Sequence, residues 1–177
     1  MENIIKEIQY KDYILEIYQD YDSFSPREDF DNLSKMICFH NKYDLADDHN
    51  LTLGEAKKLE KSKKVISLPL YMYEHGGLAF SSKPFSCRFD SGKVGFLYAY
   101  KKDIYKEYNT KRISKKLKEK ILYIFNHEID TYSKYINNEV YRYELRCKKD
   151  HSDLIDGCVG FYSIEEAIEH CAYNNVL

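Results

Sequence analysis

Four side chains, spread over three short stretches of the sequence, could carry out acid–base or nucleophilic chemistry. His40 and His75 each follow an apolar run, and an imidazole can accept or donate a proton near neutral pH. Ser86 and Cys87 lie side by side, and a cysteine becomes a nucleophile where a neighbouring histidine lowers its pKa. Neither a G-x-S-x-G motif nor a papain-like motif surrounds them, so a structural turn with a buried Cys87 is the competing interpretation.

Carboxylates that could bind a divalent cation cluster near residue 20. Asp20 and Asp22 are two residues apart and Asp31 follows, so these three are candidate ligands for Ca²⁺ or Mg²⁺. The EF-hand template does not fit, because a serine stands where that loop requires glycine. Together with Glu28 and Asp29, the same carboxylates form a candidate acidic interaction surface. The simplest alternative is an exposed turn rich in aspartate.

A second group of metal-binding residue types spans ten positions. His40 and His49 enclose three carboxylates, and both histidine and aspartate can ligate a transition metal. The spacing matches no recognised metal motif, so a polar loop is the competing interpretation. The three carboxylates belong to Asp44, Asp47 and Asp48.

The near-neutral charge of the chain hides a strong asymmetry. The sequence carries 27 Lys and Arg against 29 Asp and Glu, yet residues 61–120 carry 15 basic and 5 acidic side chains. Residues 1–60 carry 7 basic and 14 acidic side chains, and residues 121–177 carry 5 and 10. The excess of basic side chains predicts an anionic partner, a class that includes nucleic acid. The alternative is a lysine-rich face that contacts only solvent. The candidate binding residues of this basic segment are Lys101, Lys102, Lys111, Arg112, Lys115, Lys116, Lys118 and Lys120.

Composition restricts the class of protein. A chain of 177 residues with 44% hydrophobic and 15% aromatic side chains is too apolar for disorder and predicts one globular domain over 1–177. No apolar run approaches the roughly 20 residues of a membrane span, so no membrane partner is expected. The first residues lack the pattern of a signal peptide, and the five cysteines lack framework spacing. A cytoplasmic location is therefore expected.

Alternating apolar residues predict several strands. The strongest patterns cover 65–73, where Pro69 indicates an edge or a bulge, and 93–100, where Gly95 indicates a close approach of another segment. Weaker strand patterns cover 10–19, 36–39, 139–147 and 159–162.

Helical spacing predicts three helices. The longest covers 114–136, and capping-box pairs mark the starts of the other two, Thr52 with Glu55 and Ser163 with Glu166. Because helices and strands do not alternate strictly, we predict an α+β fold: a mostly antiparallel sheet of about five strands packed with about three helices.

Several motifs, taken together, resemble a widespread family of small uncharacterised proteins of bacteriophages and other mobile elements. They are Ser25-Pro26-Arg27 with Asp31-Asn32-Leu33, Met36 to His40 with Tyr43-Asp44-Leu45 and Asp47, Leu68 to Tyr71 with His75, Phe85-Ser86-Cys87 with Asp90-Ser91-Gly92 and Val94-Gly95-Phe96, Arg112 to Lys115, Glu128 with Thr131-Tyr132, and Cys158 with Gly160-Phe161-Tyr162. The family pattern usually has glycine where Ser34 and Ala46 stand, and tryptophan where Phe89 and Val159 stand. The resemblance implies a mobile-element origin and a bacterial host cell, and it implies no activity or cofactor.

Two classes of function fit these observations best, and a simple nucleic-acid-binding accessory, whose binding would fall steeply with salt, is a third interpretation. The first is an accessory protein, without a cofactor, that binds a host protein or nucleoprotein complex, such as an inhibitor of a CRISPR–Cas defence system. The alternation of acidic, basic and acidic segments along the chain favours it. So do the 18 tyrosines, because tyrosine supplies rigid amphipathic contact area at interfaces. The alternative is a small enzyme that uses a divalent metal ion and acts on a nucleotide or other phosphate compound. That enzyme requires the loops of His40, His75 and Cys87 to converge on one pocket.

Overall fold

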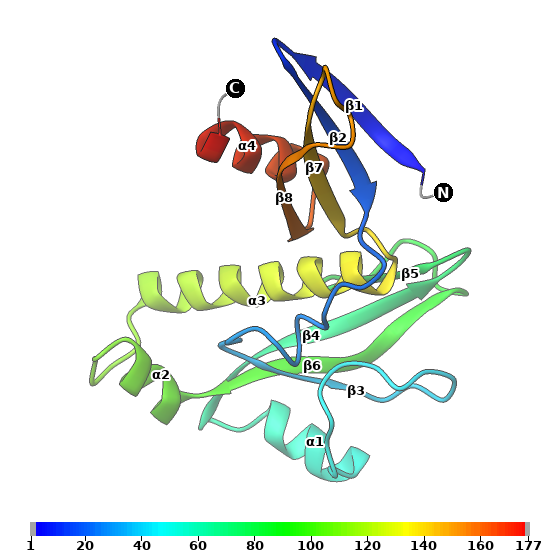
Figure 1. The fold of residues 1–177 in the computed structure, drawn as a ribbon. Helices are drawn as coiled ribbons and strands as arrows, with labels where there is room; N and C mark the ends of the chain where they lie inside the picture. The colour runs from blue at the N-terminus through cyan, green and yellow to red at the C-terminus, as the bar shows by residue number, and fades with distance from the viewer. Residues whose placement is uncertain (1–2, 176–177) are drawn as a thin grey trace. The chain divides into compact units, whose positions relative to one another are not determined.

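A computed structural model describes residues 3–175, in which eight strands form two antiparallel four-stranded sheets accompanied by four helices (Figure 1). The predicted α+β class is confirmed, whereas the predicted numbers of about five strands and three helices were too low. The fold consists of two compact units, one from residues 1–25 and 134–177 and one from residues 26–133. We call them the terminal unit and the central unit, and a single domain over 1–177 stays a prediction.

The terminal unit is a four-stranded sheet with a helix on one face. Its strands are ordered β1-β2-β7-β8, and all neighbours are antiparallel. Apolar residues alternate along β2 and β7, so Leu15, Ile17, Tyr143 and Leu145 face one side, where the helix α4 buries them with Ala167 and Cys171. The elements are β1 (Ile4–Tyr10), β2 (Tyr13–Gln19), β7 (Tyr141–Cys147), β8 (Leu154–Phe161) and α4 (Ile164–Asn175).

The central unit is a second antiparallel sheet, ordered β3-β6-β4-β5, with helices on both faces. On one face, α1 places Ala56 against Ile37 and Phe96. On the other face lies α3, whose Tyr132 packs against Phe80 of β5 (Figure 1). The elements are β3 (Lys35–Cys38), α1 (Leu53–Glu60), β4 (Val65–Glu74), β5 (Leu78–Ser81), β6 (Ser91–Tyr100), α2 (Lys101–Glu107) and α3 (Lys115–Ile136), of which the last three residues belong to the terminal unit.

Three local predictions in the central unit are confirmed. Thr52 and Glu55 form the reciprocal capping box at the start of α1. Pro69 lies outside the part of β4 that pairs with β5, and the register between β4 and β6 shifts just after it, between Leu70 and Tyr71. Gly95 lies so close to β3 that a β-carbon there would be 1.7 Å from the carbonyl oxygen of Ile37.

The topology of the central sheet brings several loops to one edge. Both β3 and β4 run antiparallel to β6, so the carboxyl ends of β3 and β4 lie at the same edge as the start of β6. His40 follows β3, His75 follows β4, and Asp90 comes immediately before β6. Residues that are 15 to 50 positions apart in the sequence therefore lie at the same edge of the sheet.

Candidate functional site

The loops at this edge of the central sheet enclose an open hollow of about 570 Å³, which we call the His75 hollow. His40 and His75 both line it, as the enzyme hypothesis requires of them. Nδ1 of His75 lies 3.6 Å from the Oδ2 atom of Asp90. A carboxylate at this nitrogen can orient the ring and leave Nε2 available for proton transfer.

Cys87 lies beside this pair of residues but is poorly arranged to act as a nucleophile. Its Sγ atom donates a hydrogen bond to Oδ2 of Asp90 over 3.4 Å, which is the same oxygen that His75 approaches. A thiolate at this position would face a carboxylate, and like charges repel. The Cys87 carbonyl accepts a hydrogen bond from Ser91, which fixes the loop, and Ser86 is exposed in it. The prediction that Cys87 is buried was wrong, because its side chain is partly exposed.

A charged pair closes another side of the His75 hollow. Nζ of Lys42 donates a hydrogen bond to Oε1 of Glu74 over 2.8 Å, and the Tyr43 hydroxyl donates to the same oxygen over 3.0 Å. These two hydrogen bonds hold the pKa of the Glu74 carboxyl below its usual value. The ring of His40 stacks on that of Tyr43, with centroids 5.2 Å apart. The polar wall of the hollow is therefore already organised without a ligand.

The most exposed large apolar side chain at this edge is Phe89, which lines the His75 hollow and is 99% exposed. It stands two residues after Cys87. Sequence reasoning did not single out Phe89, Lys42 or Asp90 as site residues. The position of Phe89 within the Phe85–Gly92 motif could have marked it as a site residue. Its exposure could not have been predicted, because no pattern in the sequence distinguishes an exposed aromatic residue from a buried one.

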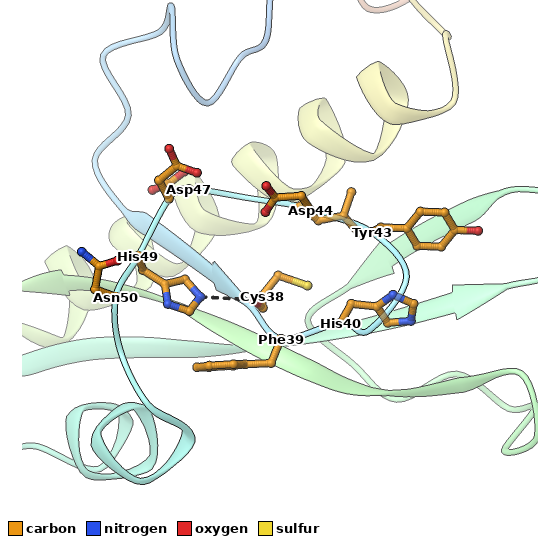
Figure 2. A pocket seen from close by; sticks show the side chains of 10 residues that line it. Cys38, Phe39, His40, Tyr43, Asp44, Asp47, His49 and Asn50 are labelled. Carbon is orange, nitrogen blue, oxygen red and sulfur yellow. Dashed lines mark hydrogen bonds between the residues drawn. The ribbon is translucent and has the colours of Figure 1, made fainter.

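A second hollow of about 560 Å³ adjoins the first, because His40 lines both. Figure 2 shows the residues that line this second hollow. We call it the His49 hollow. Nε2 of His49 lies 3.1 Å from the Cys38 carbonyl oxygen, so this nitrogen must carry the proton and donate it. Nδ1 of the same ring is buried without a hydrogen-bond partner among the described residues. Burial raises the pKa of the neighbouring Cys38 thiol to about 11, so Cys38 stays protonated at neutral pH.

A buried ion network supports the loop between β3 and α1, which contributes residues to both hollows. The guanidinium of Arg27 is only 3% exposed and binds both carboxylate oxygens of Asp47, at 2.7 and 3.0 Å. A third nitrogen of Arg27 donates to Glu128 of α3 over 3.0 Å. Asp47 also accepts a hydrogen bond from the backbone of Met36, and Glu128 accepts from the backbone of Ser34. Asp47 is thus a structural residue of the loop. Its position two residues before His49 in the sequence does not make it a metal ligand.

Several motif residues of the family resemblance meet in this network. Arg27, Asp47 and Glu128 form its ion pairs, and the Tyr132 hydroxyl accepts a hydrogen bond from the backbone of Ala46 over 2.7 Å. Ala46 has a φ of 70°, in the left-handed region that favours glycine. Glycine at this position would adopt the same conformation without strain.

The candidate acidic surface loses one of its five members. Asp20 is only 6% exposed and accepts a hydrogen bond from the backbone of Gly160 in the terminal unit, so it is unavailable at a surface. Asp22 is exposed in the terminal unit, whereas the other three carboxylates are exposed in the central unit, at Glu28, Asp29 and Asp31. Across residues 3–175 the structure shows no group of three or more His, Cys, Asp or Glu side chains that could hold a metal ion. The metal ligands predicted at Asp20, Asp22 and Asp31 gain no support.

The predicted basic residues lie together in the central unit. They occupy α2, the loop that follows it and the first turns of α3, and all except the partly buried Lys101 are exposed. None of them lines the His75 or the His49 hollow. The site at the sheet edge and the basic segment are therefore distinct features of the central unit.

Comparison with protein-family models, curated proteins and solved structures found no match for this chain. The family resemblance of the motifs thus stays an expectation. In the part of the chain that the structure describes, no helix is long and apolar enough to span a membrane.

Proposed function

We propose that this protein is an accessory protein of a phage or mobile element that binds a host macromolecular complex through the surface around the His75 hollow. The observation that carries the proposal is Phe89, a fully exposed aromatic side chain at a hollow lined by charged residues. Interfaces commonly place an aromatic anchor at their centre and polar residues at their rim.

The organisation of the surrounding side chains supports binding. Lys42 and Tyr43 are both hydrogen-bonded to Glu74, so these groups lose less conformational freedom when a partner docks than unpaired side chains would. A partner pocket that accepts the Phe89 ring would remove its apolar surface from water, which contributes roughly 25 cal/mol per Å². Among host complexes, a defence system such as CRISPR–Cas is the target class to test first, since a mobile element gains from blocking it.

The proposal is tested by affinity capture from the host with matched variants. The tagged protein, Phe89→Ala and Phe24→Ala are expressed in host cells, and the captured partners are identified and quantified. Phe24 is also an exposed loop aromatic, at 76%, but it does not line the His75 hollow. We expect Phe89→Ala to lose the main partner at least about tenfold and Phe24→Ala to retain it. Equal capture by both variants, or no enriched partner, contradicts the proposal.

A second candidate function is an enzyme that acts on a phosphate compound, and the shared hollow of His40 and His75 favours it. In this case His75, oriented by Asp90, transfers a proton, and Lys42 faces the phosphate. The experiment is turnover of nucleoside triphosphates with and without Mg²⁺ by the wild type, His75→Gln and Phe89→Ala. The enzyme hypothesis requires turnover that His75→Gln abolishes and Phe89→Ala retains, and absence of turnover excludes it for these substrates.

A further inference from the structure

The segment 101–120 presents a dense group of cations, which we call the α2–α3 basic surface. It contains nine basic and three acidic side chains. The basic ones are Lys101, Lys102, Lys106, Lys111, Arg112, Lys115, Lys116, Lys118 and Lys120, and the acidic ones are Asp103, Glu107 and Glu119.

None of these nine cations forms an ion pair with any residue that the structure describes. Elsewhere in the central unit, Lys42 and Lys93 are paired with Glu74 and Glu60. The absence of pairing on the α2–α3 basic surface leaves its charge uncompensated, although like charges at this density repel one another. An anionic partner would remove that repulsion.

Two of the three acidic side chains are directed elsewhere. Asp103 and Glu107 are four residues apart on α2, and both line a hollow with Phe30 and Leu33. Lys102 and Lys106 precede them by one position each, about 100° away around the helix. The first turn of α3 contains no acidic residue. The positive charge is thus concentrated on a part of the surface that Asp103 and Glu107 do not neutralise.

The chemistry of this surface fits a phosphate backbone better than a protein or a membrane. Within 101–120 no large apolar side chain is prominently exposed. Protein interfaces are depleted in lysine and need apolar anchors, and membrane-surface helices need an apolar face to insert. Lys102 and Lys120 lie over the rings of Tyr100 and Tyr108, at 5.3 and 5.2 Å from their centroids, which places aromatic groups beside the cations.

We propose that the α2–α3 basic surface binds the phosphate backbone of nucleic acid without reading its sequence. It is a second binding surface, beyond the docking site around the His75 hollow. Contacts to about four phosphates release condensed counterions, so affinity falls about 100-fold between 50 and 200 mM salt.

The test measures binding to a labelled 20-base-pair DNA duplex of arbitrary sequence and to the matching RNA duplex, by fluorescence anisotropy at several salt concentrations. The variant Lys115→Gln/Lys116→Gln/Lys118→Gln removes three charges from the surface. The control Lys57→Gln/Lys58→Gln/Lys61→Gln removes three exposed lysines at α1 of the same unit. Circular dichroism checks that all variants are folded.

The proposal predicts duplex binding with a steep salt dependence, weakened at least about tenfold by the α3 variant and less than about twofold by the α1 control. A preference for either duplex identifies the source of the phosphates. The proposal is overturned if neither duplex binds at 50 mM salt, or if both variants weaken binding equally. Binding to vesicles rich in anionic lipid but to neither duplex would also overturn it.

Discussion

Arg27 is the residue on which the loop architecture of the central unit depends most. Its guanidinium, nearly excluded from water, is paired with Asp47 and Glu128 at the same time. Burial alone would lower the pKa of Arg27, but its hydrogen bonds and the two negative charges raise it. Such a group is stable only while every partner is present, because each remaining charge would be buried without compensation.

We therefore predict that Arg27→Met destabilises the protein by about 3–5 kcal/mol, since it leaves two carboxylates without their counter-charge. The matched control is Lys42→Met, which removes a lysine that pairs with Glu74 at the surface and should leave the urea midpoint nearly unchanged. Urea denaturation followed by circular dichroism measures both. Similar midpoints for the two variants would refute the structural role assigned to Arg27.

Ala46→Gly is predicted to stabilise the protein by about 0.5–1 kcal/mol. Ala46 has a φ of 70°, a region that costs an L-residue roughly 1–2 kcal/mol. Glycine removes this strain, but its larger loss of chain entropy on folding offsets part of the gain. The control Ala79→Gly in the middle of β5 should destabilise instead. Thermal denaturation of the two variants decides: a lower melting temperature for Ala46→Gly would contradict the assigned backbone conformation.

Because the Cys38 thiol is buried, we predict that the protein loses stability at alkaline pH. Burial raises its pKa from 9.0 to about 11, so the folded state favours the protonated form. Its contribution is fully present below pH 9 and is lost as the pH rises toward 11, about 1 kcal/mol by pH 10. Unfolding free energies of the wild type and Cys38→Ala at pH 7.5 and 10 should show the larger decrease in the wild type. Equal decreases would mean that the thiol does not contribute.

Among the elements, the pairing of β3 with β6 depends on a glycine. A β-carbon at Gly95 would overlap the backbone of Ile37, whereas one at Gly92, in the same strand, meets nothing within 4 Å. Gly95→Ala should therefore cost at least about 1–3 kcal/mol by displacing β3, and Gly92→Ala should be neutral or slightly stabilising. Denaturant unfolding of the two variants provides the comparison, and equal stability would contradict the close approach of the strands.

Most long elements could be predicted from the sequence, because their apolar periodicity coincides with their burial. The pattern at 65–73 corresponds to β4, that at 93–100 to β6, and that at 114–136 to α3. The elements that sequence reasoning missed lack such a signal. Burial in β1 is slight, β5 has only four residues, and α2 buries only Ile104. The predicted strand 10–19 also begins too early, because Lys11 adopts a φ of 47° at a turn.

For the molecule as a whole, the residues of the site could be listed from sequence but not assembled. His40, His75 and Cys87 were candidates for their chemistry, yet only the order β3-β6-β4 brings their loops to one edge. Strand order is determined by long-range pairing, which single-sequence periodicity does not encode. The same limit hid the role of Asp47, whose partners Arg27 and Glu128 lie 20 and 81 residues away in the sequence.

The net charge of the chain, -2, likewise does not describe its individual surfaces. The basic segment retains its excess charge in the fold, because its cations remain unpaired with described residues. Of the acidic candidates, Asp20 is buried, whereas Asp22, Glu28, Asp29 and Asp31 are exposed.

The central claim is that the partner docks on the surface around the His75 hollow, and Cys87 reports on it directly. Its partly exposed thiol stands two residues before Phe89. The rate of alkylation by iodoacetamide is measured by mass spectrometry for the free protein and for the captured complex, with the partly exposed Cys147 of β7 as the internal control. We predict at least about tenfold slower alkylation of Cys87 in the complex and an unchanged rate for Cys147. Alkylation of Cys87 at the same rate in both states would contradict the claim.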